Sequence, residues 1–232
     1  MFIDNIINRK GKINMALDFS DLNGEAKKGK VDYMKLANGD NTFRIVGGIL
    51  PGYSYWVKNS AGKDMPFECL QFDRNTERFN SALPDPVAEA GLTDAQGKPL
   101  RCSWAYRCQV INRATGKLEV LQLKKGMLQD LISLAKRKGI NVTDYETGCD
   151  IVVTREKTGP KAFNVKYTVD PFCLEPTPLS DADRELIEDL KPMDELFPLE
   201  TVEEQRARLE KHLNYTPDAD DEKTKEDISD LS

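Results

Sequence analysis

Hydrophobic and polar residues alternate most regularly between Arg101 and Leu123, and this pattern predicts a β-hairpin. The two strand-like runs are 101–112 and 117–123, and the residues between them include Gly116 and are typical of a turn. Alternation along the first run predicts one face that carries Trp104, Tyr106, Cys108 and Val110. The other face would carry Arg101, Ser103, Ala105, Arg107 and Gln109. Rings and guanidinium groups this close together can pack in a core or bind a nucleic-acid strand, and the pattern leaves both uses open.

Three more strand-like runs precede this hairpin, at 42–46, 53–57 and 65–72. The polar stretch NSAGKD separates the second run from the third and predicts a hairpin turn. On the first run Arg44 is a lone cation, which we interpret as either a groove residue or a partner in a rim salt bridge. The proline-containing stretch 75–99 predicts a long connection with a short helix near 86–90.

A helical periodicity follows the hairpin, in the stretch MLQDLISLAKRKG, with Gly139 as a natural stop. Two further strands are expected at 149–155 and 163–169, joined by the turn KTGPK. Beyond Pro171, Ser180 and Thr201 have the spacing of N-caps of short amphipathic helices, and Glu204 would complete a capping box with Thr201.

This order of elements predicts a mainly β protein with an OB-fold, a small Greek-key barrel with one capping helix that typically binds oligonucleotides. Short C-terminal helices and a disordered acidic tail would follow the barrel. We divide the chain into a flexible basic arm at 1–34, an OB-fold core at 35–174 with a connecting subdomain at about 65–99, short helices at 175–215 and the acidic tail at 216–232.

Composition narrows the class of protein. The 232 residues are 39% hydrophobic and 31% charged, with a mean hydropathy of -0.55, so one well-buried domain with solvated appendages is expected. Apolar runs fall short of the ~18 residues of a membrane helix, and the first residues lack the order of a signal peptide, so we expect an intracellular protein without a membrane partner. The five cysteines form no CxxC pair, and His212 is the single histidine, which predicts free thiols and no metal site.

The net charge of -6 conceals a split between the two parts of the chain. Residues 1–174 contain 26 Lys and Arg against 20 Asp and Glu, a net charge of +6, whereas residues 175–232 contain 7 against 19, a net charge of -12. Such asymmetry indicates a basic body that meets a polyanion and an acidic appendage that meets a different partner.

Motifs of enzymes are absent from the sequence: it has no Walker loop, no HExxH and no GxSxG, so we expect neither an enzyme nor a cofactor. Basic and aromatic side chains are instead interleaved on the predicted strands, as single-strand binding requires. The candidate DNA-binding residues are Arg44, Tyr53, Tyr55, Trp56, Lys58, Arg101, Trp104, Tyr106, Arg107, Lys124, Lys125, Arg155 and Lys157.

Three stretches together resemble a known family. NTFRIVGGILPGYSYW, then CSWAYRCQVINRATGKLEVLQLKKGMLQDLISLAKRKGI, then GCDIVVTREKTGPKAFNVKYTV are similar to the core of the helix-destabilising single-stranded DNA-binding proteins of T-even and related tailed bacteriophages. The resemblance covers roughly 35–172. It implies an OB-fold that coats and protects single-stranded DNA, largely without sequence preference, in phage replication, recombination and repair, in the cytoplasm of the infected bacterial host.

The resemblance also implies roles for both ends of the chain. A basic N-terminal arm would mediate self-association along DNA, through 9–12 or 27–30. An acidic tail would recruit replication and recombination proteins and compete with DNA. Its acidic residues are Asp218, Asp220, Asp221, Glu222, Glu226, Asp227 and Asp230.

The sequence departs from this family at one point. Many relatives hold zinc through one histidine and three cysteines, but here Cys69 stands near one such position, Tyr53 or Tyr55 replaces the histidine, and SALPDPV replaces the CxxC. We therefore expect no zinc, and packing should stabilise 65–99. Two other functions stay open: a protein-interaction or regulatory module on an OB scaffold, and an RNA-binding protein.

Overall fold

The computed structural model describes residues 31–161 and 164–214, so most of the predicted basic arm and the whole acidic tail lie outside the described residues. The described protein is mainly β, with antiparallel sheets and a few helices. The strands are β1 (Gly39–Leu50), β2 (Tyr53–Lys58), β3 (Asp64–Glu68), β4 (Phe72–Asp73), β5 (Arg78–Phe79), β6 (Ser103–Trp104), β7 (Arg107–Asn112), β8 (Lys117–Gln122), β9 (Ile151–Lys157) and β10 (Val165–Val169). The helices are α1 (Pro86–Glu89), α2 (Lys125–Lys138), α3 (Asp181–Leu186), α4 (Met193–Leu196) and α5 (Val202–Leu213).

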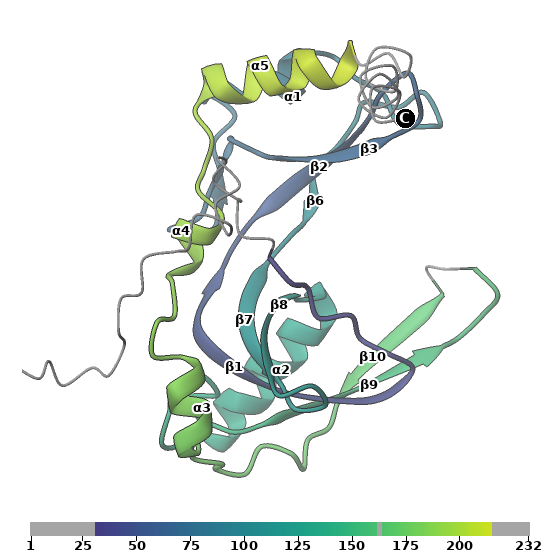
Figure 1. The fold of residues 1–232 in the computed structure, drawn as a ribbon. Helices are drawn as coiled ribbons and strands as arrows, with labels where there is room; N and C mark the ends of the chain where they lie inside the picture. Colours follow the sequence, from purple (N-terminus) through teal and green to yellow (C-terminus); the bar gives the residue numbers. More distant parts are fainter. Residues whose placement is uncertain (1–30, 162–163, 215–232) are drawn as a thin grey trace, which may run out of the picture. The chain divides into compact units, whose positions relative to one another are not determined.

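The largest sheet has five strands in the order β10-β9-β1-β7-β8, with β1 at its centre (Figure 1). Ile45 of β1 is paired with Val110 of β7, and Phe43 is paired with both Asn112 of β7 and Ile151 of β9. The helix α2 connects β8 to β9 in the chain. Strands β8 and β10 form the two edges of the sheet, so strand pairing leaves the predicted barrel open between them.

The core lies between the inner face of this sheet and α2. Phe43, Ile45 and Val110 are fully buried there because alternate residues of a strand point to the same face. Met127, Leu128 and Leu131 of α2 belong to the same core cluster. The helix ends at Gly139, whose positive φ of 68° suits a residue without a Cβ atom and confirms the predicted stop.

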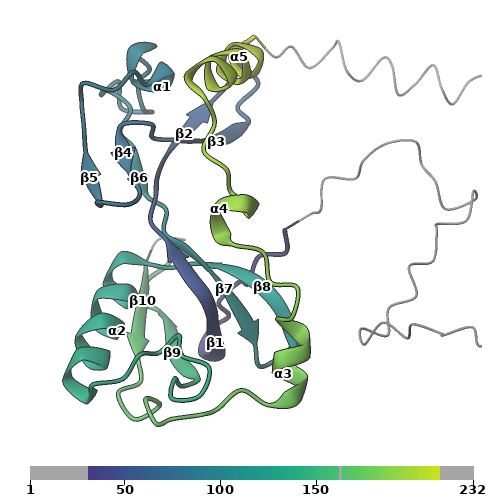
Figure 2. The same ribbon diagram turned by 90° about the vertical axis from the view of Figure 1, so that its left-hand side faces the viewer.

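A second, smaller sheet has the order β3-β2-β6, and β4 and β5 form a separate hairpin beside it (Figure 2). The β2–β3 hairpin is confirmed, and its turn is closed by hydrogen bonds between Asn59 and Lys63. Strand β3 ends at Glu68, earlier than predicted, because the chain makes a turn in which Phe72 N donates to Cys69 O. The predicted short helix at 86–90 is confirmed as α1, and buried Asp85 caps it by accepting from Val87 and Ala88.

The predicted strand 101–112 is not continuous. It divides into β6, which belongs to the small sheet, and β7, which belongs to the large sheet. Between them Ala105 N donates to Gly52 O, and Tyr106 O accepts from Leu123 N. The run therefore leaves one sheet and enters the other, and this change of partner cannot be read from alternation within the run.

The outer face of β1 and β7 is covered by residues 177–199, which we call the C-terminal strap. Leu179 and Ile187 of the strap are buried against Val46 and Ile111. Gln109 Nε2 donates to Lys191 O at 2.6 Å. The apolar and polar contacts together fix the strap on the side of the sheet opposite the core.

Two capping boxes order the C-terminal segment as predicted. Ser180 and Asp183 cap α3, and Thr201 and Glu204 cap α5. The helix α5 packs on the small sheet, where Gln205 Nε2 donates to Glu68 O and a ring nitrogen of His212 lies 2.9 Å from Val57 O. Among the described helices, none has the length and apolar character that crossing a membrane would require.

Candidate nucleic-acid interface

Five aromatic side chains meet where the two sheets join, and we call them the ring cluster: Tyr53, Phe72, Phe79, Trp104 and Tyr106. Tyr53 is at the centre, with its ring centroid 4.8 Å from those of both Phe72 and Phe79. Strand pairing sets Tyr53 of β2 directly opposite Trp104 of β6. Residues far apart in the sequence thus form one continuous aromatic group.

The indole of Trp104 is held from several directions. Its Nε1 donates to Leu123 O at 2.8 Å, and one ring face is stacked on Tyr106 with centroids 3.6 Å apart. The ammonium group of Lys125 lies 5.9 Å from the indole centroid. A cation at this distance from an exposed ring contributes about 0.5–1 kcal/mol. The arrangement places an oriented ring and a positive charge side by side, as base stacking with phosphate contact requires.

The rings of the ring cluster differ in solvent exposure, and this difference indicates two roles. Phe72 and Tyr106 are buried, and burial together with nearby Glu77 raises the pKa of Tyr106 to about 12. Tyr53 and Trp104 are half-buried, and Phe79 is 53% exposed. The buried rings therefore support the accessible ones, which have the exposure needed to contact a ligand.

The other face of the small sheet carries a separate exposed group. Trp56 projects from β2 and is 52% exposed, opposite exposed Pro66 of β3. Two residues further along β2, Lys58 lies 4.0 Å from Asp64. Trp56 and Tyr53 differ by an odd number of positions along one strand, so they lie on opposite faces of the sheet.

Arg107 lies at the end of this second face. Its guanidinium donates to Ser54 Oγ at 3.4 Å, is 3.5 Å from Glu68 Oε2, and is positioned over the ring of Phe197 at 4.8 Å. Its side chain is only 13% exposed. Arg107 thus joins β7, the small sheet and the strap, and it has protein partners on three sides.

The β9–β10 hairpin contributes two more of the predicted residues. Arg155 is paired with Tyr167, and exposed Lys157 is paired with Val165. Directly paired residues share a face of the sheet. These four therefore lie on the same face as the part of the hairpin that is buried in the core. The guanidinium of Arg155 donates to Asn38 Oδ1.

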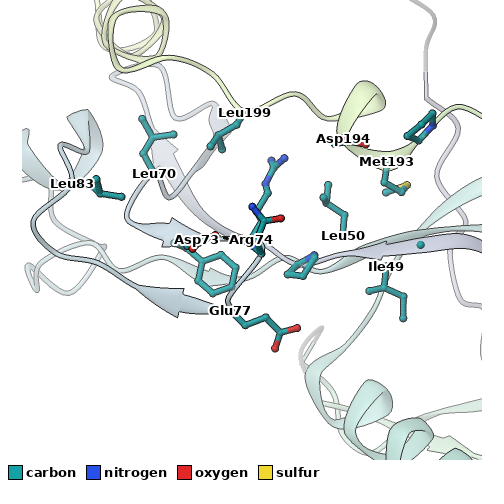
Figure 3. Close-up of a pocket in the computed structure, with 15 residues that line it drawn as sticks. Ile49, Leu50, Leu70, Asp73, Arg74, Glu77, Leu83, Met193, Asp194 and Leu199 are labelled. Atoms are coloured by element: carbon teal, nitrogen blue, oxygen red, sulfur yellow. Dashed lines mark hydrogen bonds between the residues drawn. The ribbon is translucent and has the colours of Figure 1, made fainter.

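A cavity of about 820 Å³ lies between the end of β1, the β4–β5 hairpin and the strap (Figure 3). Arg74 projects into it, donates to Phe197 O and pairs with Glu68 at 3.0 Å. Three carboxylates, those of Asp73, Glu77 and Asp194, also line this cavity. They outnumber its one cation, so the cavity does not suit a phosphate group.

Comparison with known proteins finds a relative in a bacteriophage. No family model matches the chain. A protein of Escherichia phage T5 named "Probable ssDNA-binding protein" is 30% identical to it over 225 residues, which covers 83% of this chain and 85% of the phage protein. The chain belongs to the family of this phage protein. The comparison shows a phage family, and the closer resemblance to the T-even proteins stays a prediction.

Two of the predicted residues are buried outside the ring cluster, where a ligand cannot reach them. Arg44 is fully buried, so its expected position in an exposed groove is wrong. Its guanidinium donates to Asp144 O at 2.6 Å and to Thr177 O at 2.8 Å, which ties the loop before β9 to the start of the strap. Tyr55 is buried in the core with its hydroxyl 3.5 Å from Cys69 Sγ.

The remaining predicted residues divide between three places. Tyr53, Trp104 and Tyr106 are in the ring cluster, with exposed Lys124 and Lys125 at the start of α2 beside it. Trp56 and Lys58 lie on the opposite face of the small sheet, Arg107 is at its end, and exposed Arg101 precedes β6. Arg155 and Lys157 lie on the β9–β10 hairpin.

Phe72 and Phe79 are not among the residues predicted from the sequence, and the β4–β5 hairpin brings both to Tyr53. Phe79 stands in a turn-rich stretch where two-residue strands give no periodic signal. Its only sequence signal is a large ring between Arg78 and Asn80, in a segment otherwise polar.

Cys69, which the predicted resemblance to the T-even proteins places near a zinc position, has other contacts here. A hydrogen bond with Cys102 and burial raise the pKa of the Cys69 thiol. His212 is buried on α5 beside Phe67. In the part of the chain that the structure describes, no three His, Cys, Asp or Glu side chains are arranged to hold a metal ion.

Proposed function

We propose that this chain binds single-stranded DNA and that the ring cluster is its stacking surface. The observation that carries the proposal is the half-buried indole of Trp104, stacked on Tyr106 and flanked by Lys125, in a member of a phage family whose relative is named as a probable single-stranded DNA-binding protein. Bases would stack on Phe79, Tyr53 and Trp104, each contributing about 1–3 kcal/mol. Lys124 and Lys125 would meet the phosphates.

We further propose that the five-stranded sheet is a partly open OB-fold. When the five strands of this sheet are numbered along the chain, their spatial order is fifth, fourth, first, second, third. A helix lies between the third and the fourth strand, and this arrangement supports the assignment. OB-folds bind oligonucleotides on the second and third strands and on the loops after the first and fourth strands. These correspond here to β7 and β8, the long insertion 51–106, and the β9–β10 hairpin.

Because the strap covers the outer face of β7, we expect DNA to bind along the insertion instead. Val46 and Ile111 are buried beneath Leu179 and Ile187, so that face is not free to bind a ligand. The ring cluster lies entirely within the insertion, which ends just before β7. A strand on the ring cluster would leave the strap in place.

The biological role of the protein and of its two ends is also part of this proposal. By resemblance, the protein would coat DNA during phage replication, recombination and repair in the cytoplasm of the infected host, and would act by binding rather than catalysis. The acidic tail would recruit replication proteins, and the basic arm would support self-association along the strand. The charge difference between 1–174 and 175–232 is consistent with both roles.

Titration of a labelled oligothymidylate tests this function. The full chain, and a variant that ends at Tyr215, should both bind at low salt, and affinity should fall as salt rises. Absence of binding by both proteins at low salt would contradict the proposal. Competition with an RNA oligonucleotide of matched sequence distinguishes a preference for DNA from a preference for RNA. A protein partner that is captured only through the tail, by a chain with no affinity for nucleic acid, would favour an interaction module.

A further inference from the structure

The face of the small sheet that carries Trp56, which we call the open face, is exposed around Trp56, whereas its end at Ser54 is buried beneath Arg107 and the strap residue Phe197. Trp56, Lys58, Pro66 and Ser103 are all exposed on it. The opposite face of the same sheet carries buried Tyr55, Val57 and Phe67, and Gln205 and His212 of α5 bind the backbone of β3 and β2. The exposed indole in the middle strand of this face is available for stacking.

Charge on this face favours a polyanion. The cations are Lys58, Arg107, Arg74 and exposed Arg101, two residues before Ser103. The carboxylates are Asp64, which pairs with Lys58, and Glu68, which pairs with Arg74 and Arg107. Arg74 and Arg107 are mostly buried and share Glu68, so the accessible charges are Lys58 and Arg101 against Asp64, and the face keeps a small excess of positive charge beside one exposed ring. This combination matches single-stranded nucleic acid.

Strand β6 links the two aromatic surfaces because it is an edge strand. Trp104 is paired with Tyr53 on the ring-cluster face, and its neighbour Ser103 is paired with Ser54 on the open face. A polynucleotide bound to Trp104 therefore needs only to pass over this two-residue edge to reach Trp56. Adjacent strands are only about 4.8 Å apart, so the detour is short.

We propose that the open face of the small sheet is a second subsite for single-stranded DNA, continuous with the ring cluster around the β6 edge. Trp56 stacks on a base there, and Lys58 and Arg101 contact phosphates. This inference rests on the proposed function, and it adds that one strand uses two opposite faces of the same small sheet. A short oligonucleotide fills the ring cluster alone, and a long one fills both surfaces.

The two tryptophans of the chain allow each surface to be observed separately. In the Trp104→Phe variant, Trp56 is the sole indole, and in the Trp56→Phe variant Trp104 is the sole indole. The probe is oligothymidylate in two lengths, the shorter being the shortest that quenches Trp104 emission. At saturation the short oligonucleotide should quench Trp104 only, and the long one should quench both.

A second measurement uses only exposed charges, so that folding is preserved. The double variant Lys58→Gln, Arg101→Gln should lower the slope of log affinity against log salt by about 1.4 for the long oligonucleotide, at about 0.7 for each lost phosphate contact. For the short oligonucleotide the slope should not change. Lys136→Gln, in the last turn of α2, is the matched control and should leave both slopes unchanged.

Two results would overturn the second subsite while the proposed function stands. One is Trp56 emission that the long oligonucleotide leaves unchanged while Trp104 is quenched. The other is quenching of Trp56 by the short oligonucleotide, which would place Trp56 in the same binding site as the ring cluster. Loss of all binding by the unaltered chain would instead reject the proposed function, and the second subsite with it.

Discussion

The indole of Trp104 lies nearly parallel to the phenol ring of Tyr106, with an interplanar angle of 9° and centroids 3.6 Å apart. Tyr106 is buried, so one face of the indole is supported by the protein. Lys125 is near the indole as well, and the Nε1 group is bound to the backbone at Leu123. The ring is therefore fixed before any ligand arrives, and a preorganised ring loses little conformational freedom on binding.

Replacement of Phe79 tests stacking with little risk to the fold. Phe79 is 53% exposed, so Phe79→Ala should weaken oligothymidylate binding by about 1–3 kcal/mol through loss of one stacked base. The free energy of unfolding should change by less than about 0.5 kcal/mol. Phe172→Ala is the control, since Phe172 is 83% exposed after β10 and outside the ring cluster. Equal affinities for the two variants would remove Phe79 from the interface.

Neutralising Lys125 tests the phosphate contact beside Trp104. Lys125→Gln should reduce the slope of log affinity against log salt by about 0.7, which corresponds to one phosphate on a single strand. Fluorescence anisotropy over a series of salt concentrations measures this slope. Lys136→Gln removes the same charge at the other end of α2 and should leave the slope unchanged. If both variants lower the slope equally, Lys125 acts only through net charge.

Arg44 should matter for stability rather than for DNA. Arg44→Gln would leave Asp144 O and Thr177 O without their donors in a buried site and should lower the free energy of unfolding by about 3 kcal/mol. Chemical denaturation measures this loss. The folded fraction should bind oligothymidylate as tightly as the unaltered chain. A stable Arg44→Gln variant with weakened binding would restore Arg44 to the interface.

The attachment of the strap should depend on pH through Asp183. Burial raises the pKa of Asp183, but hydrogen bonds from Arg113 and Ser180 outweigh burial and hold it below its ordinary value. A carboxylate with a lowered folded-state pKa stabilises the fold fully above its unfolded-state pKa of about 3.9, and this contribution disappears as pH falls through the folded-state pKa.

The Asp183→Asn variant checks this dependence. At neutral pH it should lower the free energy of unfolding by about 2 kcal/mol, because Arg113 loses a charged partner at 2.6 Å. The difference from the unaltered chain should shrink as the pH falls below about 4. Glu146→Gln is a suitable control, since that carboxylate pairs with Arg184 at the exposed surface. A difference that stays constant down to the acid limit would exclude a role for Asp183 ionisation.

Alternation along the chain predicted the strands that stay within one sheet. The β7–β8 hairpin, the β2–β3 hairpin, α2 and its stop at Gly139 were all accessible from local patterns. The division of 101–112 into β6 and β7 was not, because it depends on Gly52 and Leu123, which lie elsewhere in the chain. Local periodicity cannot tell which sheet a strand will join.

Local sequence patterns are also insufficient to predict the whole candidate site. The sequence predicts either a groove position or a rim salt bridge for Arg44, because nothing next to it in the sequence indicates that Asp144 and Thr177 will bury it. Phe79 was missed because only the β4–β5 pairing brings it to Tyr53. Trp104 and Tyr106 were accessible because alternation placed them on one face, and the structure shows their rings stacked.

The central claim is that the ring cluster binds single-stranded DNA. The most direct measurement is the emission of Trp104 in the Trp56→Phe variant, titrated with oligothymidylate at low salt and then with added salt. We predict saturable quenching at low salt that is reversed as salt rises, because phosphate contacts at Lys124 and Lys125 are screened. Saturable binding of the oligonucleotide without any change in Trp104 emission, or no binding at low salt, would contradict the account.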